Sequence, residues 1–363
     1  MKKYLKFAKH MVLISIFVIT GILLTITITL FLYSPGKPEP FMDDQGRNLK
    51  GSISEKKFLL IGGIRQGMFI QSKNEGNPVL LYLHGGIPDY FLTHKYPTGL
   101  EEYFTVVWWD QRGSGLSYNS DIPDDSKNLD QFLSDTKEVT NYLRTRFGKE
   151  KIYLMGRSGG TFIGIQMAAK SPELYHAYIG IAQMSDQFKS EKLAYDYVLK
   201  QFKTAGNMKM VRKLEASPVT DRIPDGYLKI RDAAMHSLGI GTTRDMNSII
   251  TGLFVPSLTF KGFTLKEKFN LWRGKAQSGV HPLWETIIVT DLSDKTNKLD
   301  IPVYFFHGKY DYTVSYDLAK MYFEKIQAPQ KRFYTFENSA HSPHFEEPNR
   351  VKDIFLNEIL NEK

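Results

Sequence analysis

The stretch KIYLMGRSGGTFIGIQMAA, residues 151–169, decides the fold. Residues 152–155 form a short apolar run, typical of a strand buried in a sheet, and apolar residues at helical spacing follow a few positions later. Between the two lies a G-x-S-x-G sequence, GRSGG, at residues 156–160. This order of strand, turn and helix predicts a nucleophile elbow that exposes the hydroxyl of Ser158 at the sheet edge, beside the positive end of the following helix.

Length and composition limit the functions that are possible. At 363 residues with 42% apolar residues, the chain can bury a large core in one large domain or two ordinary ones. Half of the net charge of +8 comes from the four lysines of the first ten residues, and no basic run with interleaved aromatic residues follows, so we expect no nucleic-acid partner. The absence of cysteine excludes disulfides, a thiolate nucleophile and cysteine-based metal sites.

Residues 11–33 are uncharged and mostly Ile, Leu, Val, Phe and Thr. As a helix this run would extend about 34 Å, enough to cross the hydrocarbon core of a bilayer. We predict a transmembrane helix over 11–33, a cytoplasmic basic tail over 1–10, a linker over 34–49 and an extracytoplasmic remainder, because the lysines precede the span. A cleaved signal peptide is the alternative, but its apolar run is shorter and it ends in a small-residue cleavage site.

The rest of the chain alternates between strand and helix patterns. We expect helices at 129–147 and 316–326, and strands at 58–61, 68–71, 79–83, 105–109, 152–155, 178–182, 302–307 and 332–336. The first two strands flank a glycine-containing turn and predict a hairpin. The alternation predicts an α/β fold, a mostly parallel sheet flanked by helices. Its core would comprise residues 50–186 and 296–363, interrupted by a helical lid over 187–295.

Serine becomes a nucleophile when a base takes its proton, and a carboxylate orients that base. In this fold the acid and the histidine follow the serine in chain order. Asp311 follows the expected strand 302–307 after a glycine turn, and His341 follows the strand 332–336. We therefore predict Ser158, Asp311 and His341 as the catalytic residues.

Other residues offer competing interpretations. Asp311 could instead cap the next helix, Asp300 is a rival acid that precedes its strand, and His344 is a rival base. We expect His307 to pack within the sheet rather than take part in chemistry. Asp110 and Arg112 are expected to form an ion pair that braces a loop beside the site, and a second acid–base site is the alternative reading.

The oxyanion of a tetrahedral intermediate needs two N–H donors. One is expected from Gly159, the residue after the nucleophile, and the other from the loop His84-Gly85-Gly86, where glycines let the backbone approach closely.

Five segments together resemble the α/β-hydrolases, and more narrowly the proline iminopeptidase-like branch: HGG at 84–86, WWDQRGSGLS at 108–117, GRSGG at 156–160, FHGKYD at 306–311 and SAHSPHFEEP at 339–348. The resemblance covers residues 50–360, with the lid matched in position only. It implies Ser158 as nucleophile, Asp311 as orienting acid, His341 as base, and the amides of Gly86 and Gly159 as the oxyanion hole. It also implies a serine hydrolase without a metal or organic cofactor.

Two departures from that family lie beside the substrate. The loop usually reads HGGPG and here continues Ile87-Pro88-Asp89, and the residue after the nucleophile is Gly159 where Trp is frequent. In that branch, acidic groups in or near the lid bind the free amine of the substrate. Four glutamates are candidates here by location alone: Glu191, Glu215, Glu267 and Glu285.

The combined reading is a membrane-anchored serine hydrolase that cleaves an ester or amide bond of a small molecule or short peptide. Proline iminopeptidase-like aminopeptidase activity is the first expectation. The alternatives are a carboxylesterase or lipase-like hydrolase of apolar esters, for which an aromatic-rich lid is suited, and a non-catalytic binding protein on the same fold.

Overall fold

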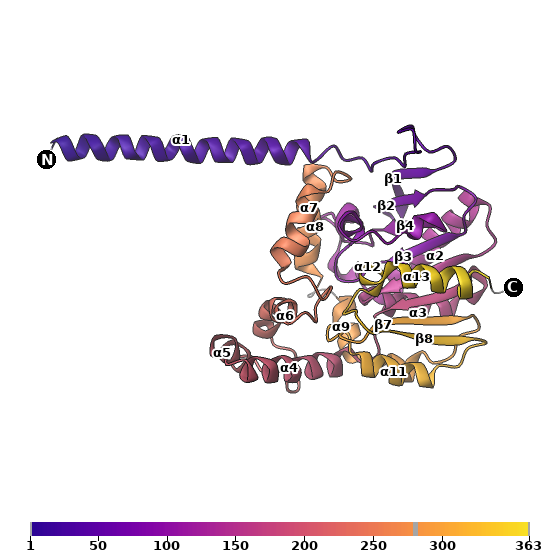
Figure 1. The fold of residues 1–363 in the computed structure, drawn as a ribbon. Helices are drawn as coiled ribbons and strands as arrows, with labels where there is room; N and C mark the ends of the chain where they lie inside the picture. Colours follow the sequence, from indigo (N-terminus) through magenta and orange to yellow (C-terminus); the bar gives the residue numbers. More distant parts are fainter. Residues whose placement is uncertain (1, 279–281, 362–363) are drawn as a thin grey trace.

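The computed structural model describes residues 2–278 and 282–361. Residue 1 of the expected tail, residues 279–281 of the expected lid and residues 362–363 of the expected core lie outside the described residues. One eight-stranded sheet has the order β1-β2-β4-β3-β5-β6-β7-β8 (Figure 1). Its strands are β1 Ile53–Ile61, β2 Ile64–Ser72, β3 Val79–Leu83, β4 Thr105–Trp109, β5 Ile152–Arg157, β6 Tyr175–Ile181, β7 Val303–Gly308 and β8 Lys331–Phe336.

The strand pairing confirms a mostly parallel sheet. β1 and β2 form the predicted antiparallel hairpin, and β2 pairs antiparallel with β4. The pairs from β4 through β3, β5, β6 and β7 to β8 are all parallel. Parallel strands place their carboxyl ends at one edge, so the loops after β3, β5, β7 and β8 meet there.

The two faces of the sheet carry separate cores. Successive strand residues point to opposite faces, so Leu81 and Leu83 of β3 join one apolar cluster while Leu80 and Tyr82 join the other. The first cluster packs against α2 (Leu129–Phe147), α3 (Gly159–Lys170) and α11 (Tyr316–Lys325). The second packs against α13 (Pro348–Ile354) and its extension Phe355–Ile359. Burial on both faces explains why the central strands are continuous apolar runs.

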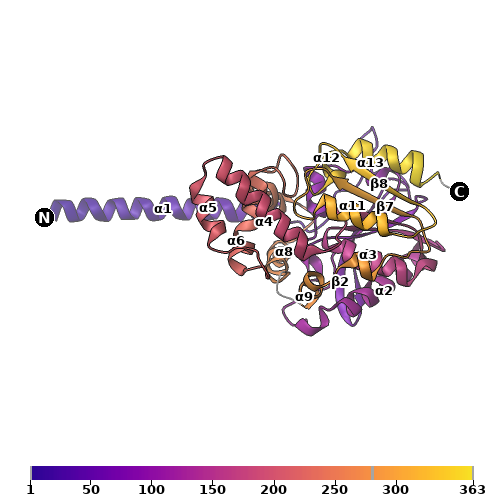
Figure 2. The same cartoon turned by 90° about the horizontal axis from the view of Figure 1, so that it is seen from below.

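In its described residues, the segment between β6 and β7 consists of helices joined by loops and adds no strand to the sheet. Its helices are α4 Gln187–Thr204, α5 Met208–Glu215, α6 Asp225–Ser237, a π-helical turn Ile250–Phe254 continued by α7 Val255–Thr259, α8 Leu265–Gln277, α9 Pro282–Val289 and α10 Leu292–Lys295. Part of the segment has its own apolar cluster, which includes Tyr195, Val198, Leu214 and Tyr227. Figure 2 shows α4, α5 and α6 on the side of the molecule toward which α1 projects.

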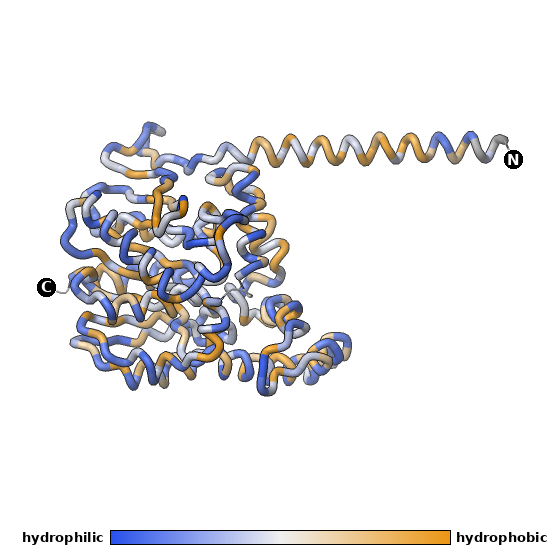
Figure 3. Tube along the Cα trace, turned by 180° about the vertical axis from the view of Figure 1, so that it is seen from behind, coloured by the Kyte–Doolittle hydropathy of each residue, from blue (hydrophilic) through white to orange (hydrophobic). Residues whose placement is uncertain are grey.

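Helix α1 (Lys2–Leu32) projects away from the sheet as a long apolar rod (Figure 3). Its part from Lys6 to Leu32 is long and apolar enough to cross a membrane, and its most apolar window is not buried against the protein. An apolar helix exposed to water along its whole length is unfavourable, so it needs an apolar environment.

Candidate active site

Ser158 lies at a strained turn between β5 and α3. Its backbone has φ 53° and ψ −125°. Among the described non-glycine residues, only Ala182 also has a positive φ. Such a conformation costs about 1–3 kcal/mol and persists only where the surrounding structure imposes it. The turn has the strand–turn–helix geometry that the G-x-S-x-G sequence predicts.

Two glycines make the turn possible by close backbone contact. A Cβ on Gly160 would lie 2.1 Å from the carbonyl oxygen of Leu83, and one on Gly156 would lie 2.6 Å from the carbonyl oxygen of Gly160. Neither oxygen can move far, because each belongs to a regular element. The helix α3 therefore packs directly onto the end of β3.

The loop after β3 lies against the same turn. A Cβ on Gly85 would lie 3.2 Å from Ser158 Oγ, and one on Gly159 would lie 4.0 Å from the backbone nitrogen of Gly86. Gly159 is the first residue of α3, so its N–H has no acceptor within the helix. The structure thus brings Gly86 and Gly159, the two predicted oxyanion donors, side by side at Ser158.

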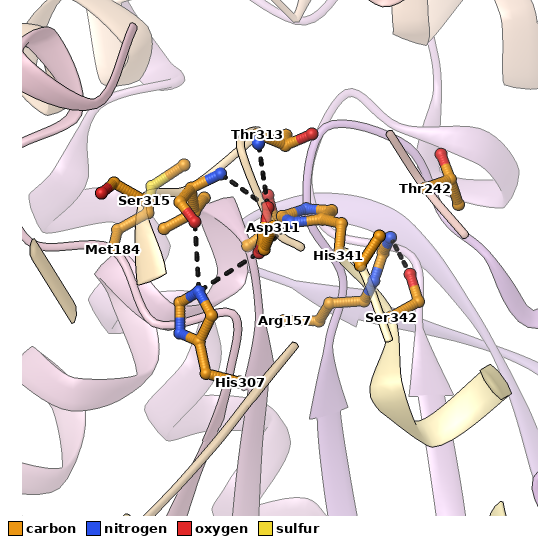
Figure 4. A network of polar contacts seen from close by, with 12 residues as sticks. Arg157, Met184, Thr242, His307, Asp311, Thr313, Ser315, His341 and Ser342 are labelled. Carbon is orange, nitrogen blue, oxygen red and sulfur yellow. Dashed lines mark hydrogen bonds and ion pairs between the residues drawn. The ribbon is translucent and has the colours of Figure 1, made fainter. Parts of the chain in front are cut away.

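His341 and Asp311 are joined by a short hydrogen bond. His341 Nδ1 lies 2.8 Å from Asp311 Oδ2, and both side chains are buried (Figure 4). The other carboxylate oxygen, Oδ1, accepts from the backbone N–H groups of Thr313 and Val314, at 2.9 Å each. With Nδ1 donating to the carboxylate, Nε2 of His341 is the atom left to accept a proton.

The charges of this pair follow from its surroundings. Burial opposes the charged form of Asp311, but the neighbouring His341 and His307 outweigh it and hold the pKa of the carboxyl below its usual value. Burial lowers the pKa of His341, against an opposing contribution from Asp311. Near neutral pH the pair is therefore a carboxylate and a neutral imidazole, the states that a general base and its orienting acid require.

The competing residues have other roles. Ser315, not Asp311, caps α11, by accepting from the N–H of Leu318. Asp300 is exposed before β7. His344 is fully buried on the other side of the loop, with Nε2 3.3 Å from the hydroxyl of Tyr82. Of the two candidate histidines, only His341 contacts the carboxylate of Asp311.

His307 lies closer to the chemistry than the sequence suggests. Its Nε2 lies 3.2 Å from Asp311 Oδ2 and 3.1 Å from the carbonyl oxygen of Val314, so its ring contacts the same carboxylate oxygen as His341. The ring is buried in the sheet, as expected, but it also supports the acid. In the sequence, this contact could have been inferred from the position of His307, four residues before Asp311 across a glycine turn.

Arg157, the variable residue of G-x-S-x-G, ties three loops together. Its Nη1 lies 3.0 Å from Asp89 Oδ2, and its Nη2 donates to Ser342 Oγ at 2.6 Å. Asp89 also accepts from the hydroxyl of Tyr82, at 2.9 Å. The altered loop sequence therefore supplies a buried carboxylate that holds the loop after β3 to the nucleophile turn and to the residue after His341.

The chain is similar to known hydrolases in sequence. Residues 79–225 match the family model described as serine aminopeptidase, S33. The probable aminopeptidase YbaC of Bacillus subtilis (strain 168) is 34% identical over 304 residues, which cover 82% of this chain and 94% of that protein. The chain belongs to the α/β-hydrolase superfamily. The fold class and the resemblance predicted from the sequence are confirmed, and the chain is a hydrolase.

The α/β-hydrolase is also similar to one further relative in sequence and to one solved structure in fold. The proline iminopeptidase of Saccharolobus solfataricus is 23% identical over 316 residues, covering 83% of this chain and 90% of the relative. The crystal structure of the proline iminopeptidase of Mycobacterium smegmatis has a TM-score of 0.56 at 16% identity, covering 84% of this chain and 98% of that one. At that identity the structural likeness concerns the fold alone.

The prediction that Asp110 and Arg112 of the hydrolase form an ion pair with each other is wrong. Arg112 instead forms a two-pronged pair with Asp135 of α2, at 2.9 and 3.0 Å, and Asp110 Oδ2 accepts from the N–H of Leu116. The partner of Arg112 lies on a helix 23 residues later, which the loop sequence does not reveal. The loop is braced by two separate contacts.

A cavity of about 650 Å³ joins the hydrolase core to its helical segment. Ser158, His341, Gly86 and Gly159 line it from the core. Apolar residues of both parts share the lining: Ile163, Met184, Leu228, Met235, Leu253, Leu283, Trp284 and Ile287. The site residues therefore face a space large enough for a small organic molecule or short peptide.

Of the four candidate glutamates, only Glu191 lines the cavity. It is buried and paired with Arg231 at 2.6 Å. Glu215 pairs with Lys203, Glu267 caps α8 and pairs with Lys56, and Glu285 is exposed. Two aspartates of α6 that the sequence reading missed, Asp225 and Asp232, also line the cavity.

Proposed function

We propose that Ser158, His341 and Asp311 form the catalytic triad of this hydrolase. His341 Nε2 takes the hydroxyl proton as Ser158 Oγ attacks the carbonyl carbon of an ester or amide. The leaving group departs with that proton, and the acyl-enzyme is then hydrolysed by a water that His341 activates. The observation that carries the proposal is the His341–Asp311 hydrogen bond at the wall of the cavity that also contains Ser158.

The backbone N–H groups of Gly86 and Gly159 are the proposed oxyanion hole. Their support is the close approach of the loop after β3 to the first residue of α3. Two such donors act at the position where the carbonyl oxygen becomes negative, and one donor typically contributes about 100- to 1000-fold in turnover.

Replacement of the nucleophile tests the triad. Ser158→Ala should lower turnover by about 10⁴-fold or more, since a triad acts as a unit, and should abolish labelling by a fluorophosphonate probe. Ser120→Ala, at an exposed serine outside the cavity, is the matched control and should label normally. Labelling of the Ser158→Ala protein at full strength would show that another residue reacts.

The substrate class that we propose first is a peptide or amide with a free amino terminus. The relatives described as aminopeptidases support it, as do the acidic side chains of the cavity wall. Asp232 is our first candidate for binding an ammonium group, because its side chain is 39% exposed although it pairs with Arg231 at 2.8 Å, whereas Glu191 is fully buried against the same arginine. Burial disfavours its charge, but Lys275 and Arg231 outweigh that effect and keep its pKa lowered, so it remains a carboxylate.

Hydrolysis of apolar esters is the second candidate. The apolar lining from both parts of the cavity favours it, because such a wall binds an acyl chain without an amine. A panel of aminoacyl amides with free and blocked amino groups, beside short- and medium-chain esters, separates the two. A free-amine preference that Asp232→Asn abolishes supports the peptidase, whereas equal rates with blocked amines eliminate it.

We also propose that α1 anchors the enzyme in a membrane, with residues 1–10 cytoplasmic and the catalytic part outside, and that residues 187–295 act as a lid over a core formed by 50–186 and 296–363. The length and apolar surface of α1 support the anchor. The shared lining of the cavity supports the lid.

A further inference from the structure

Two helices of the proposed lid that pack against each other expose large apolar side chains. Ile250, Phe254 and Val255 lie along the continuous helical stretch 250–259 and are 65%, 40% and 44% exposed, whereas Leu253 and Ser257 on its other side are buried. Phe269 of α8 is 61% exposed. We call these four side chains the apolar patch. Single exposed apolar residues are ordinary, but a group on two adjacent helices indicates a binding surface.

The two helices are packed together. Phe254 lies against Trp272 of α8, with ring centroids 5.3 Å apart, and the indole N–H of Trp272 donates to Ser257 Oγ at 2.9 Å. Lys268 Nζ of α8 donates to the carbonyl oxygen of Leu258. These contacts fix the two helices that carry the patch relative to each other.

The same helix pair holds the end of α1. Lys268 Nζ also donates to the carbonyl oxygen of Tyr33, the first residue after α1. The N–H of Gly36 donates to the carbonyl oxygen of Lys261 at 3.1 Å, and Lys261 pairs with Glu39 at 2.8 Å. The chain therefore leaves its apolar helix directly onto the helix pair. Figures 1 and 2 show α1 running away from the protein on the side where α5, α6 and the helix pair lie.

The charges around the patch suit a bilayer surface. Lys266 and Arg273 are exposed on α8, and Lys261 beside the helix pair is exposed but paired with Glu39. Glu267, the acid between them, is satisfied by Lys56 and by its own helix cap. Exposed apolar side chains with flanking cations are the composition of helices that lie in a membrane interface, where the cations attract anionic headgroups.

We infer that Ile250, Phe254, Val255 and Phe269 form a second, interfacial membrane contact that seats the lid on the bilayer crossed by α1. The inference rests on the proposed anchor. A bilayer, rather than a second protein, is the proposed occupant because the patch is fastened to the residues where α1 ends. The opposite side of the same helices lines the catalytic cavity through Leu253 and residues 274–278. One layer of helix thus separates the cavity from lipid, and a substrate that partitions into the interface reaches the lid directly.

The absence of cysteine permits a direct test in the full-length chain. Single variants Ile250→Cys, Phe254→Cys and Phe269→Cys would carry a polarity-sensitive fluorophore, after reconstitution into vesicles of phosphatidylcholine and phosphatidylglycerol. Leu356→Cys is the matched control: its 37% exposure is close to that of Phe254, and it belongs to the C-terminal segment on the side away from α1 (Figure 1). Lipids with a shallow nitroxide quencher then report contact, at a depth of roughly 5–10 Å.

Each outcome decides the proposal. Quenching at the patch positions with none at position 356 supports the contact, and the use of three positions protects against one variant that fails to fold. Vesicle flotation without quenching at the patch overturns the contact and leaves the anchor intact. A blue-shifted probe that lipid quenchers do not reach indicates a protein partner and also overturns it. Failure of the full-length chain to float with vesicles refutes the anchor and the contact together. It does not test the proposed triad.

Discussion

The carboxylate of Asp311 is the residue-scale centre of the proposed site. Its Oδ2 lies within hydrogen-bonding distance of the rings of His341 and His307, and its Oδ1 accepts from two backbone N–H groups. A carboxylate with this many donors stays ionised, and its fixed direction sets the orientation of the imidazole. The donors around the acid therefore fix the direction of the base, whereas burial of the imidazole lowers the pH at which the base becomes protonated.

The pH dependence of hydrolysis should reflect the lowered pKa of His341. A protonated imidazole cannot accept the serine proton, so kcat/KM should fall as pH decreases through this pKa, which lies below the ordinary 6.5. Because the unfolded chain binds this proton near the ordinary pKa of 6.5 and the folded protein only at lower pH, stability should fall as pH decreases from 6.5 to the lowered pKa. A pH profile of kcat/KM checks the prediction, and an acid limb centred above pH 6.5 contradicts it.

At the scale of elements, three loops are joined behind the nucleophile by one buried ion pair. Arg157→Met would leave the buried carboxyl of Asp89 without its cation, at a position where burial already raises its pKa, and should cost about 3–5 kcal/mol of stability. The double variant Arg157→Met with Asp89→Leu removes both charges and should recover a large part of that loss. Unfolding midpoints of the two proteins check this. Equal stability of the single variant and the unsubstituted protein would show that the pair is not coupled to the fold.

The packing of α3 onto β3 gives a second prediction at this scale. Gly160→Ala forces a Cβ against backbone oxygens and should destabilise the protein by about 1–3 kcal/mol or more. Gly159→Ala is the matched control, since its Cβ would lie 3.7 Å from the nearest atom and should change stability little. Thermal unfolding of both variants checks this. Equal losses would mean that the contact at Gly160 relaxes.

The sequence predicted the central strands well because they are compact apolar runs, and the hydrolase order of acid and histidine follows the strands. It missed the more polar first halves of β1 and β2, residues 53–57 and 64–67. Partners that are distant in sequence were not predictable in this way. Arg157 contacts Asp89 and Ser342, which lie 68 and 185 residues away, and nothing in their local patterns marks them. The contact of His307 with Asp311 likewise depends on how tightly the turn after β7 closes, which spacing alone does not give.

At the scale of the whole molecule, the proposed membrane anchoring of the enzyme depends on α1. Full-length protein should remain in the membrane fraction after a carbonate wash, since an apolar helix of this length stays inserted where peripheral proteins are released. Fractionation and intact-mass measurement check this. A soluble form that begins near residue 35 would identify the segment as a cleaved signal instead.

Strand β7 is synthesised long after β6, its neighbour in the sheet, and this order has a consequence for biosynthesis. These neighbouring strands are separated by roughly 120 residues of chain, and closing such a loop costs about 4 kcal/mol of entropy. Translation at about 5–20 residues per second would deliver residue 341 roughly 10–40 s after residue 158. Under the proposed triad, a ribosome-bound chain therefore carries Ser158 through about half of its synthesis before His341 is added, and it gains its base only near the end of translation.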